Sequence, residues 1–184
     1  MPHIDVGNDE FGIRSLLKYR PETALPMGML AEVLMCGPST LTSGERELIA
    51  AYVSSRNECG YCTGSHAASA AVRLPGGTTL VDQVLAGPET APVTPKLAAL
   101  LLIAGAVQQS GKAVREEDVA AAREAGATDL EIHDTVLIAA AFCLFNRYVD
   151  GLATTEPPDP AVYMASALKN VGQGYLATLD RPAG

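Results

Sequence analysis

The segment 128–149 constrains the fold of this chain more than any other. Thr128 and Glu131 have the spacing of a capping box, in which the two side chains satisfy free N–H groups at a helix start. The helix that follows, about 129–149, is the longest that the sequence predicts. Its ten-residue apolar run, 136–145, is apolar nearly all round the helix, so we expect it to be central and buried. The run is too short to span a bilayer.

Helix signals of this kind recur along the chain, whereas alternating strand patterns are nearly absent. Thr42 and Glu45 form a second capping box, and Thr94 precedes a proline at the first helical position. The sequence therefore predicts one all-α domain over residues 1–184. We expect helices over about 43–56, 59–73 (stopped by Pro75-Gly76-Gly77), 95–110, 116–125, 129–149 and 160–179, and two short helices in the first forty residues, interrupted by Pro21, Pro26 and Gly37-Pro38.

Composition supports a helical protein that associates with copies of itself. Apolar residues make up 48% of the chain, but aromatic residues only 5%, so Ala, Leu, Ile and Val must supply the core. This excludes a disordered or collagen-like chain. The apolar content exceeds what one monomer needs to bury, which predicts a homo-oligomer. The net charge of −8 argues against nucleic acid as a partner. The first residues lack a basic and apolar leader, so we expect a cytoplasmic protein without membrane attachment.

Four cysteines in a reducing compartment do not form a disulfide framework, and their spacing is more informative. Cys59 and Cys62 form a C-x-x-C motif at a helix start, where free N–H groups and the helix dipole favour a thiolate. The i, i+3 spacing places both sulfurs on one face, close enough to form a disulfide. We expect Cys36 and Cys143 to be inert, buried residues.

Two further side chains are in register with this motif. His66 follows Cys62 by one helical turn, so its imidazole can accept the thiol proton directly or through one water. Glu47 lies one helix earlier, and the small residues on its helical face allow close approach of a second helix. A Glu47 carboxylate buried against His66 would orient the imidazole and stabilise its charged form. Those small residues are Ala50, Ala51 and Ser54.

Less specific interpretations of these residues remain open. Cys59, Cys62, His66 and Glu47 have the chemistry of a four-ligand zinc site, although a single C-x-x-C without a second Cys or His pair disfavours one. Taken alone, His66 is more often a packing histidine, and Glu47 a favourable acid in a first helical turn. The absence of a βαβ pattern excludes a thioredoxin-like redox motif.

The spacing Glu-x11-Cys-x2-Cys-x3-His, from Glu47 to His66, resembles the signature of the alkylhydroperoxidase D-like family within the carboxymuconolactone decarboxylase superfamily. The segments 94–97 (TPKL) and 145–152 (FNRYVDGL) are similar to its peroxidase-related branch. The resemblance covers about residues 20–155. It implies an all-helical bundle that assembles as a trimer or hexamer and uses no metal or organic cofactor.

The resemblance also implies a role for each matching residue. Cys62 corresponds to the cysteine that becomes a sulfenic acid on attacking peroxide, and Cys59 to the partner that donates a proton and then forms the disulfide. His66 and Glu47 correspond to the relay histidine and carboxylate. Tyr61 stands where well-studied members carry a second histidine, so we expect a proton relay with fewer histidines than in those members.

The expected activity is therefore that of a thiol-dependent peroxidase or disulfide reductase, with a small peroxide as substrate and an external thiol or dithiol as reductant. Two alternatives remain open on the same residues. One is a redox sensor that uses the dithiol as a switch without catalytic turnover. The other is a lactone decarboxylase, a reaction that has no evident use for two thiols.

Overall fold

The computed structural model describes residues 1–178, and these residues are helical without a strand, which confirms the all-α prediction. The helices are α1 (Gly12–Tyr19), α2 (Pro21–Cys36), α3 (Ser43–Arg56), α4 (Gly60–Ala71), α5 (Gly77–Ala86), α6 (Pro95–Gln109), α7 (Glu116–Glu124), α8 (Asp129–Gly151) and α9 (Ala161–Lys169). Two short 3-10 turns, Gly111–Ala113 and Leu176–Thr178, complete the described secondary structure.

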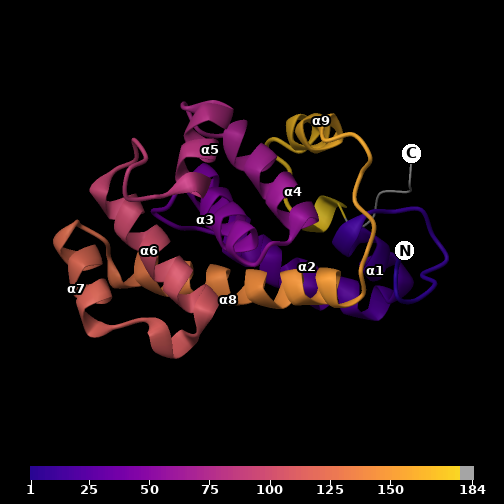
Figure 1. Ribbon diagram of the computed structural model, residues 1–184, viewed down its shortest axis with the longest axis horizontal. Coiled ribbons are helices and arrows are strands. Elements are labelled where there is room, and N and C mark those ends of the chain that lie inside the picture. The colour runs from indigo at the N-terminus through magenta and orange to yellow at the C-terminus, as the bar shows by residue number, and fades with distance from the viewer. Residues whose placement is uncertain (179–184) are drawn as a thin grey trace.

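Helix α8 is the central element, as the sequence predicts. In Figure 1 it crosses the molecule from α6 and α7 at one end to α1 at the other. Ile138, Ala139 and Phe142 on this helix are buried in the main core. By length and composition alone α8 could also cross a membrane, but half of its most apolar stretch is buried inside the protein, as in a core helix.

Helices α3 and α4 form a closely packed pair beside α8 (Figure 1). The chain reverses between them at residues 57–59, where Glu58 adopts a left-handed backbone conformation with φ of 59°. Ala50 and Ala51 of α3 are fully buried. Their small side chains allow the backbones to approach closely, so the predicted packing of the Glu47 face against a second helix is confirmed.

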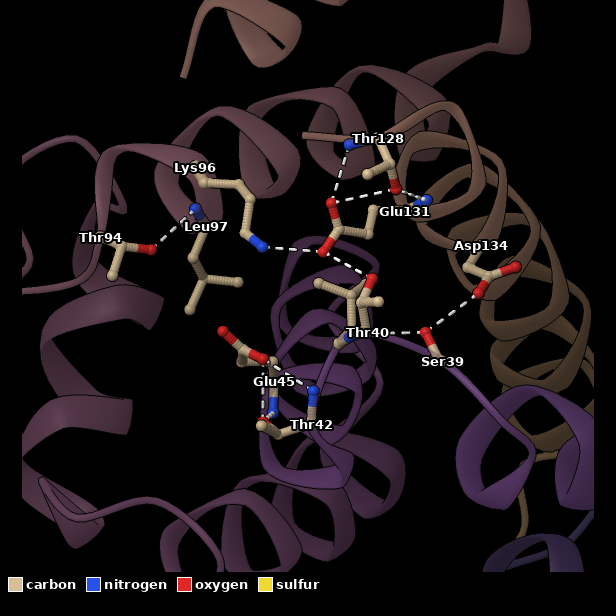
Figure 2. A network of polar contacts seen from close by, with 11 residues as sticks. Ser39, Thr40, Thr42, Glu45, Thr94, Lys96, Leu97, Thr128, Glu131 and Asp134 are labelled. Carbon is tan, nitrogen blue, oxygen red and sulfur yellow. Dashed lines mark hydrogen bonds and ion pairs between the residues drawn. The ribbon is translucent and has the colours of Figure 1, made fainter. Parts of the chain in front are cut away.

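A polar network ties three helix starts together (Figure 2). At its centre is Glu131, a fully buried carboxylate in the capping box at the start of α8. Its Oε2 accepts from the Thr128 backbone at 2.8 Å, and its Oε1 accepts from Lys96 Nζ of α6 at 2.7 Å and Thr40 Oγ1 at 2.8 Å. Burial raises the pKa of this carboxyl, but the hydrogen bonds outweigh burial and hold the pKa at about 2.

The structure corrects several predicted boundaries. The sequence predicts no helix after Pro75-Gly76-Gly77, yet α5 begins at Gly77, which has a φ of 56°. Helix α2 is not short: it has 16 residues and continues through Pro26, its sixth residue, which removes one intrahelical hydrogen bond without ending the helix, because Ala31, Leu34 and Met35 further along are buried in the fold. The last helix ends at Lys169 instead of continuing to 179, and residue 179 lies outside the described residues.

The two isolated cysteines differ in environment. Cys143 is buried in the main core, as predicted. The prediction for Cys36 is wrong, because this last residue of α2 is exposed. The apolar neighbours on α2 do not cover it, since Leu25, Met29 and Val33 of the same helix are themselves exposed.

Candidate functional site

The two cysteines of the C-x-x-C motif lie at the start of α4, where the turn after α3 ends. Cys59 is the N-cap residue, and Cys62 lies in the first turn. Both are free thiols, with exposed fractions of only 0% and 3%. The free N–H groups of this helix start therefore face a pair of sulfurs that bulk water barely reaches.

The pKa values of the two thiols are shifted in opposite directions. A hydrogen bond from Cys59 lowers the pKa of Cys62, and the charge of nearby His66 lowers it further, so that these interactions outweigh the effect of burial. The hydrogen bond to Cys62 and burial both raise the pKa of Cys59. The arrangement therefore favours a thiolate at Cys62 and a protonated thiol at Cys59, so Cys62 is the more acidic thiol of the pair.

Asn146 of α8 supports the same sulfur from the opposite side. It is fully buried, its Nδ2 donates to Ser54 Oγ at 3.1 Å, and its Oδ1 accepts from Asn57 Nδ2 at 2.8 Å. A hydrogen bond from Asn146 also helps to lower the pKa of Cys62. This residue ties α8 to α3. Arg147 does not, because it donates to the Cys143 carbonyl of its own helix.

Glu47 and His66 meet between α3 and α4. His66 Nδ1 pairs with Glu47 Oε2 at 2.7 Å, and the exposed fractions of the two side chains are 13% and 4%. Because an ionised carboxylate only accepts hydrogen bonds, Nδ1 carries a proton, and Nε2 is the ring nitrogen left free to exchange a proton with the site. The edge of Phe142 lies against the imidazole, with ring centroids 4.5 Å apart. The four residues that the sequence singles out are thus brought to one place.

A fifth residue, Tyr175, escapes sequence reasoning. It lies beyond α9, and its hydroxyl donates to Glu47 Oε1 at 2.8 Å. The hydroxyl is also 3.4 Å from His66 Nδ1, and the two rings are nearly parallel. Burial raises the pKa of Tyr175 well above its ordinary value, so the phenol stays protonated. No local pattern in the sequence signals this contact, since Gly172 and Gly174 indicate only that the chain before the tyrosine is not helical.

Four of the residues described above line a cavity of about 750 Å³: Glu47, Cys62, His66 and Tyr175. One wall is polar and follows α4: it consists of Cys62, Ser65, His66 and Ser69. The facing residues are mainly apolar and come from α1, α2 and α8: they include Ile13, Leu17, Ala24, Met27, Ala31 and Phe142. Tyr61 also lines the cavity, and its ring makes a T-shaped contact with Tyr163. Burial raises the pKa of Tyr61 to about 12.

Residues 1–178 contain no group of three His, Cys, Asp or Glu side chains placed to hold a metal ion. Glu47 directs its two oxygens to a histidine and a tyrosine, and the two cysteines hydrogen-bond to each other. The residues considered as zinc ligands therefore form hydrogen-bonded pairs in this structure.

Two solved structures resemble this fold. The chain is 30% identical to an uncharacterized peroxidase-related protein with an alkylhydroperoxidase AhpD core from Ralstonia eutropha JMP134, with a TM-score of 0.73. The match covers 81% of this chain and 76% of that one. An uncharacterized peroxidase-related protein from Silicibacter sp. TM1040 is 26% identical, with a TM-score of 0.74 over 83% of this chain and 78% of the other.

No family model matches the chain, and no curated protein does. The identity to the Ralstonia protein, over most of both chains, nevertheless exceeds what a shared fold alone requires. The likeness extends to a second peroxidase-related protein with the same architecture. The chain belongs to the peroxidase-related branch of the alkylhydroperoxidase AhpD-like family.

Proposed function

We propose that this protein is a thiol-dependent peroxidase that reduces organic hydroperoxides with its Cys59–Cys62 dithiol. The observation that carries the proposal is the pair of buried thiols with pKa values shifted in opposite directions beside the Glu47–His66 pair, with Cys62 in the wall of a cavity whose facing side is mainly apolar. A lone buried cysteine would not need a second thiol of raised pKa or a histidine–carboxylate pair next to it.

In the first step, the Cys62 thiolate attacks the peroxide R–O–O–H. An S–O bond forms, the O–O bond breaks, and the alkoxide RO⁻ leaves. The alkoxide takes a proton from the imidazolium of His66, whose charge Glu47 stabilises, or from the Cys59 thiol, and departs as the alcohol. Cys62 is oxidised by two electrons to a sulfenic acid, and the peroxide is reduced by two electrons.

In the second step, the Cys59 sulfur attacks Cys62. A disulfide forms, the S–O bond breaks, and the oxygen leaves as water after taking one proton. An external thiol or dithiol, for which the cytoplasm is the expected source, then supplies two electrons and two protons to restore the dithiol. No sulfur atom needs to cross a large distance, because the two cysteines share the first turn of α4.

The cavity favours an organic peroxide over hydrogen peroxide. Its volume of about 750 Å³ is far larger than hydrogen peroxide needs and falls in the range of cavities that hold drug-sized ligands. The apolar side chains from α1, α2 and α8 can bury a hydrocarbon group while α4 presents the thiol.

Mass spectrometry of the thiols, before and after one equivalent of cumene hydroperoxide, tests this proposal. We expect the parent protein to gain one Cys59–Cys62 disulfide, and Cys59→Ser to accumulate sulfenic acid and then sulfinic acid on Cys62. Cys62→Ser should consume no peroxide. Undiminished peroxide consumption by Cys62→Ser would exclude the mechanism. Disulfide formation without steady-state turnover on an added dithiol would indicate a redox sensor instead.

A further inference from the structure

The C-terminal segment that follows α9 contributes a side chain to the relay. Tyr175 donates its hydroxyl to Glu47 Oε1 while His66 occupies Oε2 of the same carboxylate. Each oxygen of a carboxylate with an exposed fraction of only 4% therefore has its own donor. A buried carboxylate stays ionised and fixed in orientation only when it has such partners, because burial alone disfavours the charge.

The position of Tyr175 is itself defined by contacts of the chain on either side of it. Glu32 of α2 accepts from the Leu176 backbone N–H at 3.0 Å, directly after the tyrosine. Gly174, directly before it, passes so close to the Glu32 carboxylate that a Cβ there would overlap it. Arg73 donates to the Asn170 carbonyl at 3.4 Å, near the start of the segment. The chain thus uses residues of two other elements to hold Tyr175 over the relay.

We propose that Tyr175 is a positioning residue of the relay: it holds Glu47 so that Nδ1 of His66 stays protonated and Nε2 stays available to exchange protons at Cys62. The inference rests on the proposed function of the Cys62 thiol. Tyr175 acts through Glu47 and His66 and does not itself touch the sulfur.

Several other titratable groups surround the relay and must be considered in any pH measurement. They are Glu32 and Cys36 from α2, Cys59, Tyr61 and Cys62 from the start of α4, Arg73 after α4, Asp150 from α8 and Tyr163 from α9. None of them is altered by a Tyr175→Phe substitution, which removes one hydroxyl group. A change in the acidity of Cys62 in that variant therefore reports the relay.

The test is a titration of the Cys62 thiolate by absorbance near 240 nm, taken as the difference between each variant and the same variant carrying Cys62→Ser. We expect Tyr175→Phe to raise the apparent pKa of Cys62 by about one unit or more. We also expect kcat/KM for cumene hydroperoxide to fall about tenfold at neutral pH and to recover at high pH, where the thiolate forms without help. Tyr19→Phe, which changes an exposed tyrosine of α1, is the matched control and should change neither quantity.

A second pair of variants tests the inference without altering Tyr175. Glu32→Ala removes the acceptor for the Leu176 N–H, whereas Glu32→Gln keeps an acceptor oxygen. We expect Glu32→Ala to raise the apparent pKa of Cys62 in the same direction as Tyr175→Phe, and Glu32→Gln to remain close to the parent.

An unchanged thiolate titration in folded Tyr175→Phe would overturn the proposal, since a purely structural tyrosine would leave the acidity of Cys62 unaltered. If Tyr175→Phe does not fold, equal titrations for Glu32→Ala and Glu32→Gln would overturn it in the same way. The titration needs no peroxide. A folded protein without peroxidase turnover would refute the proposed function, but the titration would still test the role of Tyr175 independently.

Discussion

The carboxylate of Glu47 and the imidazole of His66 are 19 residues apart in sequence but form a 2.7 Å hydrogen bond between two packed helices. The charge of His66 is one of the influences that lower the pKa of Cys62. A change in the charge of Glu47 therefore alters the acidity of Cys62 through the imidazole. A substitution at Glu47 tests this pairing directly.

Glu47→Gln keeps the size of the side chain but removes its charge. Without that charge the imidazolium is less stable, so we expect the apparent pKa of Cys62 to rise and kcat/KM to fall roughly 10- to 100-fold at neutral pH. Peroxide-consumption assays across pH measure both effects. Glu124→Gln, on an exposed position of α7, is the control. Equal rates for the parent and Glu47→Gln would remove Glu47 from the relay.

Asn146→Ala should cost both stability and reactivity. It removes the hydrogen bonds that Asn146 makes to the buried Ser54 hydroxyl and to the half-buried Asn57 amide, which we expect to lower the free energy of unfolding by about 1–3 kcal/mol. The lost hydrogen bond to Cys62 should also raise the pKa of that thiol. Urea unfolding measures the first effect and thiolate titration the second. A destabilised variant with an unchanged titration would limit Asn146 to a structural role.

Acid stability should depend on Glu131. Its pKa is lowered to about 2 in the folded protein, so its contribution to stability is fully present above the ordinary carboxyl value of about 4.5 and is lost as the pH falls towards 2. Glu131→Gln should therefore be less stable than the parent at neutral pH, and the difference should shrink between about pH 4.5 and pH 2. Urea midpoints over this range provide the measurement, and a constant difference would contradict the assignment.

Filling the cavity should discriminate between peroxides by size. Met27 lines the cavity, whereas Met29 of the same helix is exposed and does not. We expect Met27→Trp to reduce kcat/KM for cumene hydroperoxide severalfold while the rate with hydrogen peroxide changes little, because only the larger substrate needs the space. Met29→Trp should affect neither rate. Equal losses for both peroxides in Met27→Trp would show that the cavity does not hold the organic group.

Local chemistry made much of the fold predictable. The capping boxes at Thr42 and Thr128 and the Thr94 cap mark helix starts through contacts within three residues, and α3, α6 and α8 begin where these signals stand. Helix α5 was missed because two adjacent glycines usually end a helix, whereas Gly77 here begins one with a left-handed backbone.

The candidate site was predictable in part for the same reason. Cys59, Cys62 and His66 lie within two turns of one helix, so their spacing alone places them together. The contact between Glu47 and His66 required two helices to pack, which the small residues of α3 indicated. Tyr175 lies 128 residues from Glu47, and no local pattern reports a contact over that separation. Cys36 was misjudged because residue type alone does not show which face of α2 lacks a neighbour.

The exposure of Cys36 determines what a labelling reagent would see in this protein. Cys59, Cys62 and Cys143 are buried, so a bulky maleimide added to the folded chain reaches Cys36 first. A total count of the thiols that react with maleimide would therefore report mainly Cys36 at the end of α2 and say little about Cys59 and Cys62. Oxidants could also cross-link two molecules through this position, and gels run without reducing agent would show a dimer band unrelated to catalysis. Replacing Cys36 with serine gives the background in which such assays can be interpreted.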